Sequence, residues 1–212
     1  MNGYPYIISV ILLSLLFGVA GCSDKEKAQK QEANATPSPS EPMTVHVSKE
    51  TSTASRTKRF TIRDIDGRQT ILEFTDHEAR FHRIRQPLVM LVLFADWCPP
   101  CRGMLPYLGK LQAANKDQLF VIGLLVHSEL DSTGLRRLMR RYESNFFISR
   151  APDNDALADY LAGLAKQGSD YPLPLTLIFK DGKYIMNIQG AVPYEMLQSL
   201  IDQLREIKKK EG

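Results

Sequence analysis

An apolar run at positions 88–95 passes directly into the motif WCPPC at positions 97–101. The run is too uniformly hydrophobic for a strand with one face in water, so it predicts a central strand buried on both sides. The residues from position 98 onward are compatible with a helix. Two cysteines separated by two residues, where a buried strand gives way to a helix, are typical of a dithiol redox site.

Cys98 and Cys101 are therefore the candidate catalytic residues, with Cys98 as the attacking sulfur and Cys101 as the resolving thiol. At the first turn of a helix, Cys98 faces unpaired backbone N–H groups and the positive end of the helix dipole, which favour its thiolate. Cys101 lies one turn further on and can reach back to break a mixed disulfide. Pro99 and Pro100 suit this turn because the N–H groups they lack have no acceptors at a helix start.

Two other interpretations of the cysteine pair are half of a zinc site and a structural disulfide. A closed zinc site needs four ligands. The only other cysteine is Cys22, and the histidines show no ligand spacing; they are His46, His77, His82 and His127. We favour redox chemistry, and we predict no metal and no cofactor other than the Cys98/Cys101 disulfide.

Length and charge limit the remaining choices. The chain has 212 residues, of which 43% are hydrophobic and 24% charged, and this fits one globular domain with additional terminal segments. The net charge of +3 and the absence of a basic face interleaved with aromatic residues give no reason to expect nucleic acid as a partner.

The N-terminus carries an apolar segment at positions 7–20 that is shorter than the roughly 20 residues needed to span a bilayer. It ends in Val19-Ala20-Gly21-Cys22, which resembles the bacterial lipobox, where a signal peptidase cuts before the cysteine and the cysteine is acylated. We predict a signal peptide at 1–21 and a lipid anchor on Cys22. The alternative is an uncleaved signal anchor, since positions 1–6 contain no Lys or Arg.

Positions 22–57 are rich in Lys, Glu, Gln, Ser, Thr and Pro and hold few large apolar residues. Such a segment cannot bury enough surface to order itself, so it predicts a flexible linker with a reach of roughly 30 Å. It would keep the following domain close to a membrane.

The globular part is predicted at 58–212. Alternating patterns around Asp66-Gly67 indicate a β-hairpin. Further strands are expected at 88–95, 119–126, 174–180 and 183–189, and helices at 98–116 with a kink at Pro106, 132–142, 153–166 and 193–208. Asp153 or Asn154 would cap the third of these helices.

This order of elements resembles the thioredoxin fold: an α/β domain with a central mixed sheet flanked by helices, here with an N-terminal β-hairpin extension. Trp97, Pro106, the segment at 173–182 and Gly190 match the thioredoxin pattern in spacing. The resemblance implies a cis proline at 174 beside the sulfurs, with Pro172 as the competitor for that role. It also implies a set of substrate-binding residues: Trp97, Pro99, Pro100, Leu173 through its backbone, and Pro174.

The hairpin, the lipobox and the WCPPC motif together resemble the TlpA/ResA-like group of membrane-tethered thiol–disulfide reductases. That resemblance implies a domain facing the periplasm or cell exterior, which reduces cysteine-containing extracytoplasmic proteins such as apocytochrome c. A membrane electron donor of the DsbD/CcdA type would keep the dithiol reduced. A disulfide oxidase or isomerase and a non-enzymatic adaptor on the same fold remain alternatives.

The chain departs from these families at the acid that helps to deprotonate the second cysteine. The thioredoxin acid would fall at Val92, and the acid found in some ResA-like proteins at Met104. Asp96, Glu129 and Asp170 are candidate proton acceptors for Cys101, although each is more typical of a surface carboxylate.

Two weaker features have ordinary explanations. The arginines at 136, 137, 140 and 141 fall on adjoining turns and predict a solvated helix face. His127, at a strand end, is expected to be a packing or surface residue rather than a catalytic base.

Overall fold

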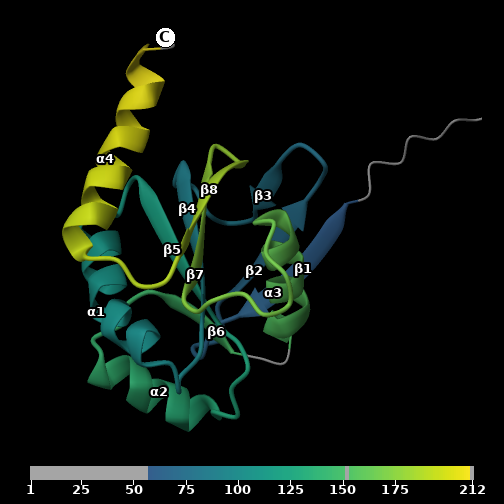
Figure 1. The fold of residues 1–212 in the computed structure, drawn as a ribbon, viewed down its shortest axis with the longest axis vertical. Coiled ribbons are helices and arrows are strands. Elements are labelled where there is room, and N and C mark those ends of the chain that lie inside the picture. The colour runs from purple at the N-terminus through teal and green to yellow at the C-terminus, as the bar shows by residue number, and fades with distance from the viewer. Residues whose placement is uncertain (1–56, 151–152, 211–212) are drawn as a thin grey trace, which may run out of the picture. The chain divides into compact units, whose positions relative to one another are not determined.

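The computed structural model describes residues 57–150 and 153–210 (Figure 1). In chain order its elements are β1 (Lys58–Arg63), β2 (Gln69–Phe74), β3 (Ala79–Phe81), β4 (Leu88–Phe94), α1 (Pro99–Ala114), β5 (Leu119–Leu125), α2 (Ser132–Arg141), β6 (Phe147–Arg150), α3 (Asp153–Leu164), β7 (Leu175–Lys180), β8 (Lys183–Gln189) and α4 (Tyr194–Lys210).

The strands form two sheets. A three-stranded antiparallel sheet has the order β1-β2-β3, and a five-stranded mixed sheet has the order β6-β5-β4-β7-β8. In the larger sheet β4, β5 and β6 are parallel, whereas β7 is antiparallel to β4 and β8 to β7. Every residue of β4 is buried, so the prediction of a central strand at 88–95 is confirmed.

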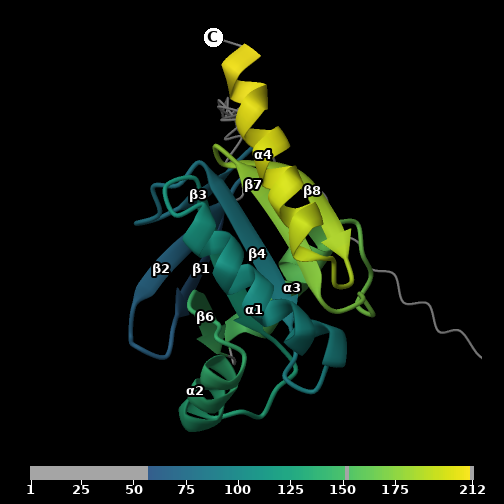
Figure 2. The same ribbon diagram turned by 90° about the vertical axis from the view of Figure 1, so that its left-hand side faces the viewer.

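The five-stranded sheet separates two apolar layers. On one face, Leu105 of α1 and Leu197 of α4 belong to the same buried cluster as Met90 of β4. Figure 2 shows α1 and α4 in front of this face. On the other face, Leu157 of α3 packs in a second cluster with Leu72 of the N-terminal sheet. This arrangement confirms the predicted thioredoxin-like fold.

The N-terminal sheet is attached by aromatic packing. The ring centroids of Phe74 and Tyr160 lie 5.0 Å apart, and those of Phe74 and Phe179 lie 6.0 Å apart. The hairpin predicted around Asp66-Gly67 is confirmed, and Gly67 has a φ of 81°, which a glycine adopts without steric cost. The sheet is therefore a fixed part of the domain.

The short strand β3 was not predicted, and it joins this sheet to the turn between β7 and β8. The backbone N–H of Ala79 donates to the carbonyl of Gly182 at 2.7 Å. A Cβ at position 182 would lie 2.5 Å from the Ala79 carbonyl oxygen, and Gly182 has a φ of 80°. Only glycine fits this close approach.

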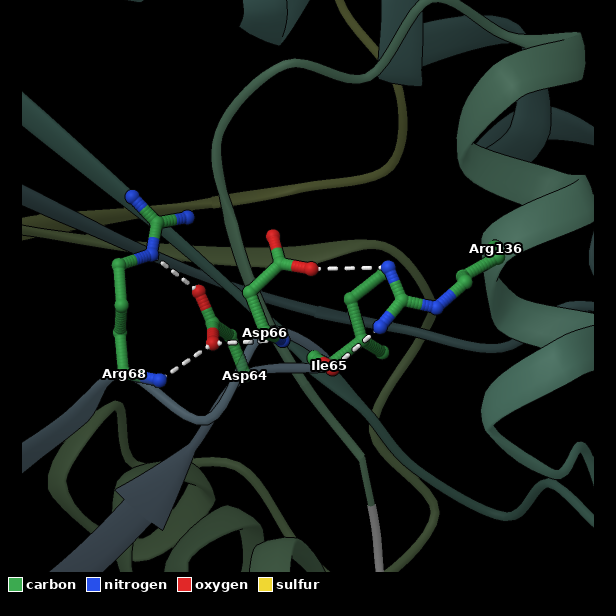
Figure 3. Close-up of polar contacts among 5 residues, drawn as sticks. All are labelled: Asp64, Ile65, Asp66, Arg68 and Arg136. Atoms are coloured by element: carbon green, nitrogen blue, oxygen red, sulfur yellow. Dashed lines mark hydrogen bonds and ion pairs between the residues drawn. The ribbon is translucent and has the colours of Figure 1, made fainter.

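The helix α2 contacts the hairpin turn through one of its arginines. Arg136 donates to the Asp66 carboxylate at 2.8 Å and to the Ile65 carbonyl at 2.7 Å (Figure 3). The turn itself is held by Asp64, whose carboxylate accepts from the backbone and side-chain N–H groups of Arg68 at 2.8 and 2.6 Å. Arg136 is exposed, as the sequence predicts, and it also connects α2 to the hairpin turn.

The four predicted helices are confirmed with small shifts at their ends, and Pro106 lies inside α1 without ending it. The suggestion that Asn154 caps α3 is wrong, because the helix begins one residue earlier, at Asp153, and the Asn154 side chain is buried inside the domain. Its amide donates to the carbonyls of Leu125 and Ser149 at 2.8 and 2.9 Å, and its oxygen accepts from the Ser149 hydroxyl. It joins β5 and β6 to α3.

The predicted lipid anchor at Cys22, the signal peptide at 1–21 and the linker up to residue 56 lie outside the described residues. Within residues 57–150 and 153–210, none of the helices has the length and apolar character needed to cross a membrane.

Candidate active site

Cys98 and Cys101 form a disulfide at the start of α1, with their Cα atoms 5.3 Å apart. Cys98 is the N-cap residue, with an extended backbone, and the backbone N–H of Cys101 donates to its sulfur at 3.3 Å. Side chains at an N-cap accept hydrogen bonds from the first turn. The strand β4 ends just before this point, so the buried strand delivers Cys98 directly to the helix N-terminus.

Pro99 and Pro100 occupy the first two positions of α1 and are exposed. They lack N–H groups, so Cys101 supplies the first N–H of the helix that can reach the Cys98 sulfur. In the reduced protein this donor and the positive end of the helix dipole favour a thiolate at Cys98. Because proline fixes the backbone angle φ, the two exposed prolines make the turn next to the Cys98 sulfur rigid.

A second loop contacts the disulfide from the start of β7. The Leu173–Pro174 peptide bond is cis, and it is the only cis bond in the described part of the chain, so the Tyr171–Pro172 bond is trans. The Cys98 sulfur lies 3.6 Å from the Leu173 carbonyl oxygen. The disulfide sulfur carries no proton, so this is a packing contact, but a Cys98 thiol in the same place can donate to that carbonyl.

The residues around the disulfide differ in solvent exposure: some are buried and others are exposed. Cys98 and Cys101 are 4% and 1% exposed, and Pro174 is also buried. Trp97 is 61% exposed, and Leu173 is half-buried. Of the predicted substrate-binding residues, Trp97, Pro99 and Pro100 are thus exposed next to a nearly covered disulfide, whereas Pro174 lies beneath the surface.

The group that holds Trp97 was not predicted from the sequence. The indole Nε1 donates to the backbone carbonyl of His127 at 2.9 Å, and His127 has a φ of 51°. The His127 backbone N–H donates to the Asp155 carboxylate at 3.4 Å, and its imidazole Nε2 lies 3.4 Å from the Tyr171 hydroxyl. No sequence pattern predicts a left-handed backbone conformation at a residue other than glycine or asparagine. The contact between Trp97 and the His127 carbonyl therefore could not be predicted.

Tyr171 links His127, which holds Trp97, to the loop that contains the cis Leu173–Pro174 bond. Burial raises the pKa of the Tyr171 hydroxyl to about 12, and the nearby Asp159 and Asp155 carboxylates add to this shift. Tyr171 therefore stays protonated at neutral pH, where it is a hydrogen-bonding group and not a base.

The candidate proton acceptors differ in their surroundings. Glu129 and Asp170 are exposed. Asp96 is half-buried, and its Oδ1 is covered and has no hydrogen-bond partner among the described residues. Val92 and Met104, at the positions of the two missing acids, are buried in the apolar cluster that contains both cysteines.

In the described part of the chain, no three His, Cys, Asp or Glu side chains lie together in a way that could hold a metal ion.

A thioredoxin-like fold with a CxxC disulfide at the start of its first helix defines a thiol–disulfide oxidoreductase. Among curated proteins, the thiol–disulfide oxidoreductase ResA of Bacillus thuringiensis is 25% identical over 146 residues, which cover 68% of this chain and 74% of that protein. No family model matches the chain.

Solved structures support the fold. A thioredoxin-family thiol:disulfide interchange protein from Chlorobium tepidum aligns with a TM-score of 0.53 and 16% identity, over 69% of this chain and 92% of that one. The thioredoxin domain of a thiol–disulfide oxidoreductase from Bacteroides vulgatus aligns with a TM-score of 0.50 and 17% identity, over 69% and 92%. The predicted fold and enzyme class are confirmed.

Proposed function

We propose that this protein is a membrane-anchored, extracytoplasmic reductase that transfers electrons from the Cys98/Cys101 dithiol to disulfides in other proteins, with apocytochrome c among its substrates. The observation that carries the proposal is the position of the Cys98 sulfur. It caps α1, accepts from the Cys101 N–H and lies beside the Leu173 carbonyl at the start of β7.

The chemistry proceeds by two exchanges at sulfur. The Cys98 thiolate attacks a substrate disulfide, which forms a mixed disulfide and releases one substrate sulfur as a thiolate that takes up a proton. The Cys101 sulfur then attacks Cys98, which releases the second substrate sulfur. Two electrons pass to the substrate, one proton comes from Cys101 and one from solvent, and the Cys98–Cys101 disulfide remains.

Substrate binding uses the surface around the dithiol. Trp97, Pro99 and Pro100 are exposed beside the sulfurs, and the Leu173 backbone would pair with an extended substrate segment in the manner of an added strand. The disulfide is almost fully covered, so a substrate reaches Cys98 only by docking on this surface.

We infer the direction of electron flow from the predicted membrane anchor. A reductase outside the cytoplasm needs a supply of electrons, and a lipid on Cys22 with a flexible linker would hold the domain near a membrane donor of the DsbD/CcdA type. An oxidase would need no such donor.

Substrate trapping tests the proposal. In the full-length protein, Cys101→Ser should accumulate mixed disulfides with extracytoplasmic proteins, because Cys98 still attacks and nothing resolves the product. Cys98→Ser is the matched control and should trap nothing. Mass spectrometry of the trapped species, apocytochrome c included, identifies the substrates.

Two results would contradict the proposal. One is equal trapping by the two variants, which would remove the assigned roles of the cysteines. The other is a wild-type protein whose Cys98/Cys101 pair is mainly oxidised in growing cells, which would favour a disulfide oxidase.

A further inference from the structure

His127 has a backbone conformation that few residues other than glycine adopt. Its φ of 51° lies in the left-handed region, which costs free energy for a residue with a Cβ. Residues in this region persist where their surroundings hold them, and they gather at functional sites. His127 is held at its backbone N–H, its carbonyl and its imidazole, and each of these groups contacts a different segment of the chain.

The position of His127 follows from the pairing of β4 and β5. Phe94 pairs with Leu125 where the two parallel strands end, and the backbone N–H of Val126 donates to the Phe94 carbonyl at 3.0 Å. The chain that leaves β5 at His127 therefore lies beside the chain that leaves β4 toward Trp97. The His127 carbonyl accepts from the Trp97 indole Nε1 at 2.9 Å as a result.

The start of α3 holds the backbone of His127. Asn154 is buried, and its amide donates to the Leu125 carbonyl at 2.8 Å, which attaches the first turn of α3 to the end of β5. The next residue is Asp155, whose carboxylate accepts from the His127 N–H at 3.4 Å and lies 3.9 Å from the imidazole Nδ1. The carboxylate thus contacts His127 from a helix that is itself attached to β5.

The imidazole of His127 contacts the loop before β7 at Tyr171. Tyr171 is buried, and its hydroxyl lies 3.4 Å from the imidazole Nε2, which is its one hydrogen-bonding partner in the described part of the chain. At neutral pH the hydroxyl keeps its proton, so it donates to Nε2. The proton of the neutral imidazole then lies on Nδ1, the nitrogen that faces the Asp155 carboxylate.

These contacts close a ring that includes Cys98. Trp97 precedes Cys98 in the chain, and Tyr171 lies two residues before Leu173, whose carbonyl oxygen is 3.6 Å from the Cys98 sulfur. The exposed indole and the Leu173 backbone are two parts of the proposed docking surface. The contact between His127 and Tyr171 connects these two parts.

We propose that His127 and Tyr171 are positioning residues, which hold the Trp97 indole and the Leu173 backbone at a fixed separation and so determine how a protein disulfide docks on Cys98. This inference rests on the proposed function and names the side chains that shape its docking surface. A rigid surface loses little entropy when it binds, so a looser one binds protein substrates more weakly. A small disulfide without a peptide chain depends less on this surface.

The first measurement uses the indole N–H of Trp97. Trp97 is the only tryptophan of the sequence, so this group gives one NMR signal in the full-length protein, and its exchange with solvent reports the hydrogen bond to the His127 carbonyl. Tyr171→Phe keeps the ring and removes the hydroxyl. His127→Asn keeps a residue that tolerates the left-handed region and shortens the side chain. Each should speed the exchange about three- to tenfold, the effect of one hydrogen bond.

The second measurement compares two rate constants of the reduced full-length protein, one with an unstructured peptide that carries an internal disulfide and one with hydroxyethyl disulfide. The ratio of the peptide value to the small-molecule value should fall about three- to tenfold in Tyr171→Phe and in His127→Asn. Asp155→Ala should lower the ratio as well. Asp155→Asn should restore most of it, because its amide oxygen still accepts from the His127 N–H.

His77→Asn is the matched control, because His77 is exposed and its side chain has no polar contact in the described chain. It should change neither readout. The inference is wrong if the indole exchange or the ratio of rate constants stays at the wild-type value in either Tyr171→Phe or His127→Asn, or if His77→Asn lowers the ratio as far as they do.

The ratio measures docking and does not depend on the direction in which electrons flow in the cell. A failure of the proposed substrates or of the proposed direction would therefore leave this result intact, and the two failures can be told apart.

Discussion

Trp97 is the most exposed large apolar side chain of the described residues, and one hydrogen bond to the His127 carbonyl fixes its indole. An exposed aromatic ring held rigidly beside a reactive group suits the binding of a protein partner, because little side-chain entropy is lost on contact. This residue should therefore act in substrate binding and not in the redox equilibrium.

We predict that Trp97→Phe lowers kcat/KM for a protein disulfide substrate by about tenfold, because it removes the indole N–H and part of the contact area. The potential of the dithiol should not change. Tyr107→Phe, at another exposed aromatic residue of the described chain, is the control and should have no effect on kcat/KM. Equal losses in the two variants would argue against a binding role for Trp97.

Tyr171 makes the folding stability of the domain depend on pH in the alkaline range. The pKa of its hydroxyl is raised from 10.0 to about 12, mainly by burial. Below pH 10 the hydroxyl is protonated in both states, and between pH 10 and about 12 only the unfolded state ionises. Stability is therefore lost as the pH rises through this window.

Tyr171→Phe should flatten that loss, with urea denaturation midpoints that fall less between pH 10 and pH 12 than those of the wild type. Tyr107→Phe is again the control and should follow the wild type. Parallel curves for Tyr171→Phe and the wild type would contradict the assignment.

At the scale of elements, the contact between α2 and the N-terminal hairpin depends on Arg136 (Figure 3). Its side chain is 46% exposed and that of Asp66 is 55% exposed, so the ion pair is partly screened by solvent.

Arg136→Ala should lower the free energy of unfolding by about 1 kcal/mol or less, and the loss should shrink at high salt. Hydrogen exchange in the turn at 64–68 should become faster. Arg137→Ala, at an exposed neighbour with no polar contact in the described chain, is the matched control and should change neither property. Faster exchange in both variants would mean that α2 as a whole is loosened.

Elements with strong local patterns were predictable, and those made by distant partners were not. The buried run at 88–95 and the helix after Cys98 follow from hydrophobicity and cap chemistry within the segment itself. β3 has 3 residues and β6 has 4, too few for a periodic pattern, and each exists because a neighbouring strand pairs with it. Asn154 failed as a predicted cap because its tertiary partners compete for its side chain.

The candidate site divides in the same way. Cys98, Cys101 and Pro174 carry signals of spacing and residue type. The support of Trp97 by His127 depends on the assembled fold, and no local pattern contains it.

At the scale of the whole chain, we propose that a lipid on Cys22 and the linker after it hold the redox domain near a membrane. Cys22→Ala should release the protein from membranes, because acylation needs that thiol. The rate of disulfide reduction by the released protein with a soluble substrate should not change, since the dithiol lies in the separate domain. Fractionation of cells into membrane and soluble parts tests this, and continued membrane association would favour an uncleaved anchor.

The central claim is that the Cys98/Cys101 dithiol donates electrons to other proteins. The reduction potential of this pair in the full-length protein, measured at pH 7 against glutathione, tests it most directly. We predict a value close to the roughly −270 mV of thioredoxin, at which the dithiol reduces most protein disulfides. A value near the roughly −120 mV of strongly oxidising enzymes would contradict the account and make the protein a donor of disulfides.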